Sequence, residues 1–483
     1  MASFTSPRGP FLLPLELIDN IVHEVVVQAF SSRYRTNALC TLCRICKAFY
    51  FSAQSRLLTS IDLSLSDTQT AEERAAVLVD ILLKDPSLHQ RIRSLKVVFK
   101  GPNDGPVVPA SLLRLLDLAV KSTSLKKLSI EWYRYESTSP AATEPLRWSQ
   151  LDPEPASPLI KEIHANPSLE SLQLVNIRKV PPYLLLSKFQ SRSFHDLVLK
   201  STFFTFLNRR TFADWELSLE ALERIGVLTL SSASVTSISL LCDEIKEHPS
   251  FKPFPSPVFF KCLHTLCIEV PEQTSFYFFI QVIESVSRTL ETLELWTYAA
   301  NLDGLNLWFS LESLTMLKTY KFYTLLDISN ATIESEKVAS HMQALRRSLS
   351  TAPSSSPLSN IHIGFFIDIQ DPHTHRLSNP TPHLNILYGI DWAPIDEMHA
   401  PLYPSRSSVL PALQHISVQI ERYYNCSKGL GIETRSKDKD YNIPLSNIFP
   451  RTCQRLSLQQ TDIVEMYTTY TSEHVSGIFS RPF

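Results

Sequence analysis

The sequence predicts an α/β protein with a short all-helical N-terminal module and a long repeat region built on a largely parallel sheet. Three observations predict this class. The chain has 483 residues, more than one compact core usually holds. From residue 57 onward, the pattern hydrophobic-x-x-hydrophobic-x-hydrophobic recurs. Between many copies lie apolar segments with helical period, and parallel strands need a crossover of about a dozen residues, usually a helix.

The first part of the chain carries two apolar stripes. Pro14 suits the first helical position, where its missing N–H is not needed, and Glu16 lies near the positive end of the helix dipole. The first stripe comprises Leu17, Ile18, Ile21, Val22, Val25 and Val26, and the second comprises Leu39, Leu42, Ile45, Cys46 and Phe49. Because a domain this small makes only a marginal core, we expect the stripes to need a partner.

The motif Leu13-Pro14-Leu15-Glu16-Leu17, followed by these stripes, resembles an F-box over residues 10–60. The resemblance implies that the module docks on a Skp-family adaptor, and through it on a cullin-RING ubiquitin ligase. The implied adaptor contacts are Leu13, Pro14, Leu15, Leu17, Ile18, Ile21, Val22, Leu39, Leu42, Cys46 and Phe49. Many F-boxes carry a late tryptophan where this chain has only Phe49 or Phe51. The alternative is two ordinary amphipathic helices at the start of a larger domain.

The copies of the hydrophobic-x-x-hydrophobic-x-hydrophobic pattern resemble the strand of a leucine-rich repeat. They begin at Leu58, Ile92, Leu125, Leu169, Phe194, Ile225, Leu263, Leu290, Leu314, Leu358, Leu413 and Cys453. The resemblance implies an irregular leucine-rich-repeat-like solenoid over residues 61–483 that binds the substrate. Regular repeats carry Asn or Cys after the last strand leucine, whereas this chain has residues such as Tyr133 and Ala233, so we expect individual turns. The alternative is a non-repeat α/β domain.

Two insertions interrupt the repeats. Residues 134–158 are rich in Pro, Ser, Thr and Glu and are predicted to form a loop. Residues 368–411 combine many prolines with apolar residues, which indicates an ordered loop or a docking element. Side chains that alternate with the strand leucines are expected on the concave face. The candidate substrate-binding residues are therefore Glu131, Glu269, Glu294, Trp296, Lys318, Tyr320 and, from the second insertion, Trp392. Any one of them could instead pack beneath a loop.

Composition limits the classes of function. The net charge of −2 argues against a nucleic-acid partner, and no apolar run reaches the ~18 residues that a membrane span needs. Eight cysteines without a paired framework suit a reducing compartment, so we expect a cytoplasmic or nuclear location, or both. Cys40, Cys43 and Cys46 fall along a predicted amphipathic helix and are not expected to bind metal.

No catalytic motif stands out. The chain lacks G-x-S-x-G, G-x-x-x-x-G-K-[ST], G-x-G-x-x-G and H-E-x-x-H, and the cluster at Asp371-Pro372-His373 lies in a proline-rich insertion. We therefore expect no enzyme activity, cofactor or metal. The hypothesis is a substrate-recognition subunit that holds its target near a ubiquitin-loaded enzyme. The alternatives are a leucine-rich-repeat scaffold with no ligase role and an unrecognised hydrolase.

Overall fold

The computed structural model describes seventeen segments of the chain. These are residues 14–28, 32–63, 68–101, 108–134, 146–152, 158–186, 195–205, 220–247, 259–270, 273–298, 309–327, 335–369, 390–399, 409–425, 434–437, 447–456 and 465–471.

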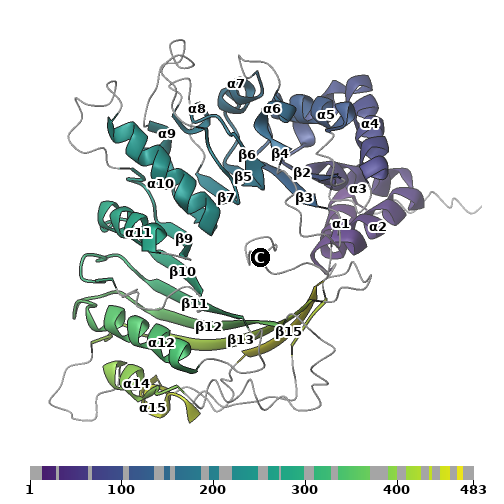
Figure 1. The fold of residues 1–483 in the computed structure, drawn as a ribbon. Helices are drawn as coiled ribbons and strands as arrows, with labels where there is room; N and C mark the ends of the chain where they lie inside the picture. Colours follow the sequence, from purple (N-terminus) through teal and green to yellow (C-terminus); the bar gives the residue numbers. More distant parts are fainter. Residues whose placement is uncertain are drawn as a thin grey trace, which may run out of the picture.

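One large sheet dominates the described part of the chain. It has 13 strands in the order β1-β2-β3-β5-β7-β8-β9-β10-β11-β12-β13-β15-β14, and neighbours are parallel except β14 and β15. The sheet curves through an arc (Figure 1). Its strands are β1 (Ser60–Leu63), β2 (Ser94–Gly101), β3 (Lys127–Arg134), β5 (Ser171–Val175), β7 (Asp196–Lys200), β8 (Val227–Leu230), β9 (Thr265–Val270), β10 (Thr292–Tyr298), β11 (Thr319–Asp327), β12 (Asn360–Ile369), β13 (His415–Asn425), β14 (Thr434–Lys437) and β15 (Glu465–Thr471). The predicted α/β class with a largely parallel sheet is confirmed.

Helices line the outer side of this arc, and the strands form its inner side (Figure 1). The connecting helices are α4 (Thr68–Lys84), η1 (Pro86–Arg91), α5 (Ala110–Val120), α6 (Trp148–Leu151), α7 (Pro158–Ala165), α8 (Tyr183–Leu186), α9 (Glu220–Arg224), α10 (Ser232–Glu247), α11 (Gln273–Ser285), α12 (Ser335–Ser350), α14 (Ala393–His399) and α15 (Pro450–Leu456). The main hydrophobic core lies between the two layers and runs from Leu58 to Cys453. Stacked strand–helix units therefore share one continuous core.

The register of the strands explains why the apolar pattern repeats. Ile61, Leu95, Leu128, Leu172, Leu197, Leu228, Leu266, Leu293, Tyr320, Ile361 and Ile416 are partners across successive strands, and all are buried. Two predicted copies are wrong. The copy at Leu314 is three residues early, because Leu317, Tyr320 and Phe322 supply the pattern of β11. Cys453 lies in α15, and the next strand is β15.

A backbone ladder runs along the edge where the parallel strands begin. The carbonyl of Arg93 accepts hydrogen bonds from the N–H groups of both Lys126 (2.8 Å) and Lys127 (3.0 Å). The same pair of hydrogen bonds to one carbonyl then repeats from one unit to the next. The further acceptors are the carbonyls of Lys126, Glu170, His195, Gly226, His264, Glu291, Lys318 and Ser359. The units therefore stack uniformly at this edge. No side chain takes part in these bonds, so the sequence carries no signal for them.

Part of the first insertion is ordered, which corrects the prediction of a loop. Within residues 134–158, β4 (Leu146–Arg147) pairs with β6 (Ile177–Arg178), and α6 follows directly. Leu146 and Trp148 are buried in the main core. These two apolar side chains anchor the segment against the sheet layer despite the Pro and Ser around them.

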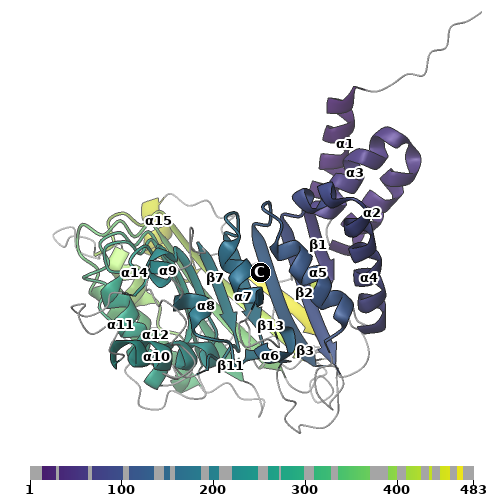
Figure 2. The same cartoon turned by 90° about the horizontal axis from the view of Figure 1, so that it is seen from above.

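Three helices at the N-terminus project from one end of the sheet (Figure 2). They are α1 (Leu15–Gln28), α2 (Ser32–Ile45) and α3 (Lys47–Thr59). Their own small core contains Ile18, Val22, Leu39, Leu42 and Ala53. The carbonyl of Pro14 accepts the N–H groups of Leu17 and Ile18, and α1 begins at Leu15. Pro14 therefore lies one residue before the first helical position, and not at that position as predicted.

Candidate functional site

The two faces of the sheet carry different side chains. Along β10, Leu293 and Leu295 belong to the main core beneath the helices. Side chains alternate along a strand, so Glu294 and Trp296 lie on the opposite face, which we call the inner face. Trp296 belongs to a separate apolar cluster with Leu325 and Phe366. The inner face is therefore built from both polar and aromatic residues.

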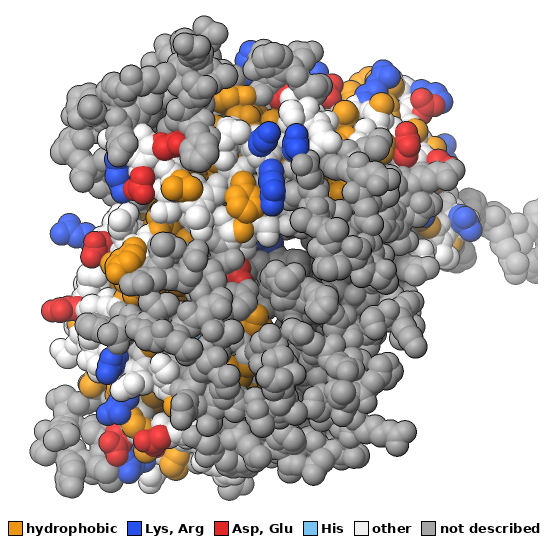
Figure 3. All heavy atoms as spheres, viewed as in Figure 1, with side chains coloured by type: hydrophobic (Ala, Val, Ile, Leu, Met, Phe, Trp, Pro, Cys, Tyr) orange, Lys and Arg blue, Asp and Glu red, His pale blue; other side chains and the backbone are white. Residues whose placement is uncertain are grey.

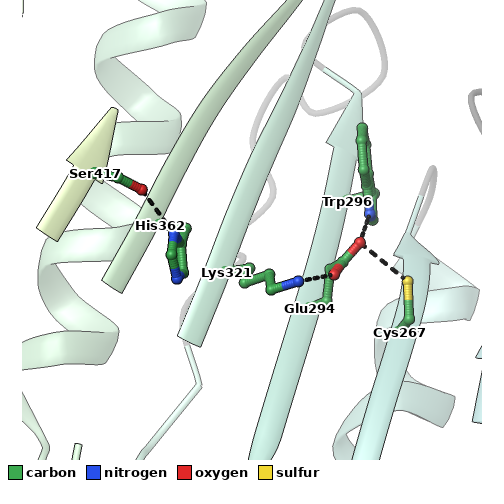
Figure 4. Close-up of polar contacts among 6 residues, drawn as sticks. All are labelled: Cys267, Glu294, Trp296, Lys321, His362 and Ser417. Atoms are coloured by element: carbon green, nitrogen blue, oxygen red, sulfur yellow. Dashed lines mark hydrogen bonds and ion pairs between the residues drawn. The ribbon is translucent and has the colours of Figure 1, made fainter. Parts of the chain in front are cut away.

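Glu294 is the centre of a polar network on the inner face (Figure 4). Its Oε1 accepts hydrogen bonds from Trp296 Nε1 (2.8 Å) and from Cys267 Sγ (3.4 Å). Its Oε2 lies 2.9 Å from Lys321 Nζ. Cys267, Glu294 and Lys321 are register partners on β9, β10 and β11, so the parallel pairing brings them together. The ion pair and the indole fix the carboxylate in one orientation.

The polar row continues onto the next two strands. His362 on β12 is the register partner of Lys321, and Ser417 on β13 is the partner of His362. His362 Nδ1 lies 2.6 Å from Ser417 Oγ, within hydrogen-bonding distance (Figure 4). The row therefore crosses five neighbouring strands, from Cys267 to Ser417.

An aromatic cluster adjoins the polar row. The ring centroid of Trp296 lies 4.4 Å from that of Tyr323 and 4.6 Å from that of Phe366. Gly364 makes this packing possible, because a Cβ atom there would lie 2.3 Å from Tyr323 Cδ1. Tyr323 therefore lies directly over the strand at Gly364, and any larger residue would displace the ring.

Two ionisable groups of this site, the Cys267 thiol and the Tyr323 phenol, are held in their neutral forms. Burial raises the pKa of the Cys267 thiol well above its usual value, and the nearby Glu294 carboxylate raises it further. Burial likewise raises the pKa of the Tyr323 phenol, with a contribution from Glu294. A nucleophilic thiol needs a lowered pKa, so Cys267 is arranged as a hydrogen-bond donor. The neutral Cys267 thiol and Tyr323 phenol are therefore suited to hydrogen bonding and packing, and not to nucleophilic chemistry.

A second polar cluster lies on the inner face near the N-terminal end of the sheet. Glu131 on β3 is 1% exposed, and its Oε1 lies 3.0 Å from Lys96 Nζ. Ser129 Oγ (2.7 Å) and Gln173 Nε2 (3.1 Å) donate to the same oxygen. Nearby, burial lowers the pKa of Lys200, while the Glu131 carboxylate opposes this shift. Strands β2, β3 and β5 thus present a buried carboxylate with three donors.

The structure places four of the seven predicted substrate-binding residues on the inner face: Glu131, Glu269, Glu294 and Trp296. Glu294 and Trp296 are in contact, and Glu269 is the register partner of Trp296. Glu131 belongs to the separate cluster on β3. Trp296 lacks the exposure that a substrate-binding residue needs, since its side chain is 1% exposed and packs against Tyr323 and Phe366.

The other three predicted residues lie elsewhere. Tyr320 is the register partner of Leu293 and packs in the main core near Phe309. Lys318 precedes β11, at the edge of the sheet with the backbone ladder, and forms an ion pair with Glu291 (2.8 Å). Both errors follow from reading β11 three residues early. Trp392 packs against Phe365 and Phe449 of the main core, on the helix side of the sheet. Its ring fills space between layers, so the docking role expected for it is wrong.

Sequence reasoning missed Cys267, Lys321, Tyr323, His362 and Phe366. Each one alternates with a core residue on its strand. Aligning β11 on Tyr320 and Phe322 would have placed Lys321 and Tyr323 on the inner face. The pairing of Lys321 with Glu294 additionally requires the strand order, which single strands do not reveal.

The predicted adaptor residues divide into buried and exposed sets. Ile18, Val22, Leu39 and Leu42 fill the module's own core, and Phe49 is partly buried against it. Pro14, Leu17, Ile21 and Cys46 are exposed, Leu15 begins α1, and Leu13 lies outside the described residues. The predicted adaptor contacts do not include Ile45, Tyr50 and Phe51, which are also exposed on this module.

No protein-family model and no curated protein matches this chain. Within the described segments, no helix is long and apolar enough to cross a membrane. On the face seen in Figure 3, acidic and basic side chains of the described residues are interspersed.

Proposed function

We propose that the protein is the substrate-recognition subunit of a Skp-cullin-F-box ubiquitin ligase in the cytoplasm or nucleus. The helices α1 to α3 dock on the adaptor, and the inner face of the arc holds the target protein. The chain performs no chemistry itself. It raises the effective concentration of the target near the ubiquitin-loaded enzyme.

The observation that carries the proposal is an exposed apolar pair on a projecting module. Leu17 (48% exposed) and Ile21 (40% exposed) are one turn apart on α1, while their neighbours Ile18 and Val22 are buried in the module core. Fully burying one such side chain contributes about 1.5–3 kcal/mol. Leu17 and Ile21 are each already partly covered in the free chain. Burying the rest of both side chains on docking therefore contributes about 1.5–3 kcal/mol in total. This gain is typical of an interface anchor.

The inner face supports the second half of the proposal. Lys96, Lys321 and His362 are each partly exposed there, so they can meet a partner. Glu131 holds Lys96 and Glu294 holds Lys321 through ion pairs, and the strand register places His362 beside Lys321. Polar groups held in place before binding lose little freedom when a target docks.

Affinity purification of the full chain tests the adaptor half of the proposal. We expect a Skp-family adaptor to co-purify with the wild-type chain and to be lost or strongly reduced with Leu17→Ala/Ile21→Ala. The matched control is Leu240→Ala on α10, which removes a side chain of similar exposure (49%) far along the chain. Partners recovered without any adaptor would favour a scaffold with no ligase role.

A further inference from the structure

Two histidines meet at the ladder edge of the sheet. His195, Gly226 and His264 are consecutive acceptors of the backbone ladder, and they precede β7, β8 and β9. His195 is exposed and His264 is half-buried. The backbone therefore sets two imidazoles on either side of a residue that has no side chain.

The two rings approach through their Nε2 atoms. These atoms lie 3.2 Å apart, and the ring centroids are 5.1 Å apart. A Cβ atom on Gly226 would lie 2.6 Å from His195 Nε2 and 2.9 Å from His264 Nε2. Both nitrogens thus converge over Gly226, and the glycine leaves the space in which they meet.

We propose that His195 and His264 together bind one divalent cation of the kind that prefers imidazole, with Zn²⁺ as the representative ion. Two nitrogens bound at about 2.0–2.1 Å in a tetrahedral arrangement are separated by roughly 3.3 Å, close to the observed distance. Imidazole also suits Cu²⁺ and Ni²⁺, whereas Mg²⁺ prefers oxygen ligands. The distance between the two Nε2 atoms and the imidazole donors therefore both favour a divalent transition-metal ion such as Zn²⁺.

A hydrogen bond orients the better-buried ligand. His264 Nδ1 lies 3.1 Å from Thr265 Oγ1. If both Nε2 atoms bind the ion, the ring proton of His264 resides on Nδ1 and is donated to this hydroxyl. Histidine ligands usually donate their second N–H in this way, and removing the acceptor typically weakens metal binding about 10- to 100-fold.

The site has two protein ligands. Among the described residues, no group of three His, Cys, Asp or Glu side chains could hold a metal ion. Water completes the coordination, so the affinity is lower than that of a closed structural zinc site. The bound ion links β7 to β9 across β8. Because it binds the folded chain, it raises the unfolding temperature with ion concentration.

Equilibrium dialysis with Zn²⁺ on the metal-free full-length protein tests this site, with the unfolding temperature as a second readout. His195→Ala and Gly226→Ala should each lower the bound zinc by one ion per chain and abolish the corresponding rise in unfolding temperature. Thr265→Val should lower the affinity for that zinc ion about tenfold or more. The cysteines are common to all variants, so any zinc that they bind cancels in the comparison.

The control is the second histidine pair, His362 and His415, whose ring centroids are 5.4 Å apart. His362 Nδ1 is already engaged by Ser417, so His415→Ala should leave the zinc stoichiometry unchanged. Replacing the exposed His195 should not prevent folding, so that variant decides the result even if Gly226→Ala unfolds. Equal zinc binding by wild type and His195→Ala would overturn the proposal and leave the pair as a simple hydrogen bond.

Discussion

Acid should destabilise the fold through a buried histidine on α12. His341 is 2% exposed, and its Nδ1 lies 3.1 Å from Thr297 Oγ1 and 3.3 Å from Thr324 Oγ1. Its Nε2 is buried and has no hydrogen-bond partner among the residues that the structure describes. A neutral ring with its proton on Nδ1 fits these surroundings, whereas a second proton on Nε2 would have no acceptor. Burial accordingly lowers the pKa of His341 to about 4.

The size and sign of the effect follow from this pKa. The unfolded chain binds the proton below about pH 6.5, but the folded chain does not bind it until about pH 4. The stabilisation is therefore complete above pH 6.5 and is lost as the pH falls toward 4. A difference of about 2.5 pKa units corresponds to about 3 kcal/mol of unfolding free energy.

Urea unfolding between pH 7.5 and pH 4.5 measures the loss. His341→Asn offers an amide near the position of Nδ1 and cannot titrate. Relative to its own stability at pH 7.5, this variant should lose about 2–3 kcal/mol less than wild type by pH 4.5. Identical pH dependence in the two proteins would refute the reasoning.

Three further predictions concern packing and reactivity. Leu172→Ala and Leu293→Ala, both fully buried, should each cost about 2–5 kcal/mol and lower the unfolding temperature, and near-silent results at both would mean that the shared core is wrongly described. Gly364→Ala should displace the ring of Tyr323 and cost about 1–3 kcal/mol, visible as a changed near-UV circular dichroism spectrum; an unchanged spectrum would contradict the packing. Cys267 should resist iodoacetamide until the chain unfolds, and mass spectrometry showing it alkylated as fast as the exposed cysteines would disprove its neutral, hydrogen-bonded state.

The sequence predicted most strands because each carries its own apolar anchors. Leu128 and Leu172, for example, are separated by a long crossover yet become direct partners in the sheet. The prediction failed at β11, where Leu314 and Leu317 also fit the pattern and the aromatic Tyr320 and Phe322 are the true core residues. Periodicity alone could not choose between two overlapping matches three residues apart.

The site was less predictable than the fold. Glu294 and Trp296 are two residues apart on one strand, so alternation alone placed both on the inner face. Their cross-strand partners Cys267 and Lys321 are each 27 residues from Glu294 in the sequence, and only the register brings them together. The meeting of His195 and His264 across Gly226 depends on the backbone ladder, which no side-chain pattern encodes.

The affinity of the purified chain for a recombinant Skp-family adaptor tests the central claim most directly. We expect the wild-type chain to bind, and Leu17→Ala/Ile21→Ala to raise the Kd at least about tenfold, because losing two interface anchors should cost more than about 1.4 kcal/mol. Lys321→Ala, on the inner face, should leave the Kd unchanged. A wild-type chain that does not bind the adaptor, or a double variant that binds it equally well, would contradict the proposal that α1 to α3 are a ligase docking module.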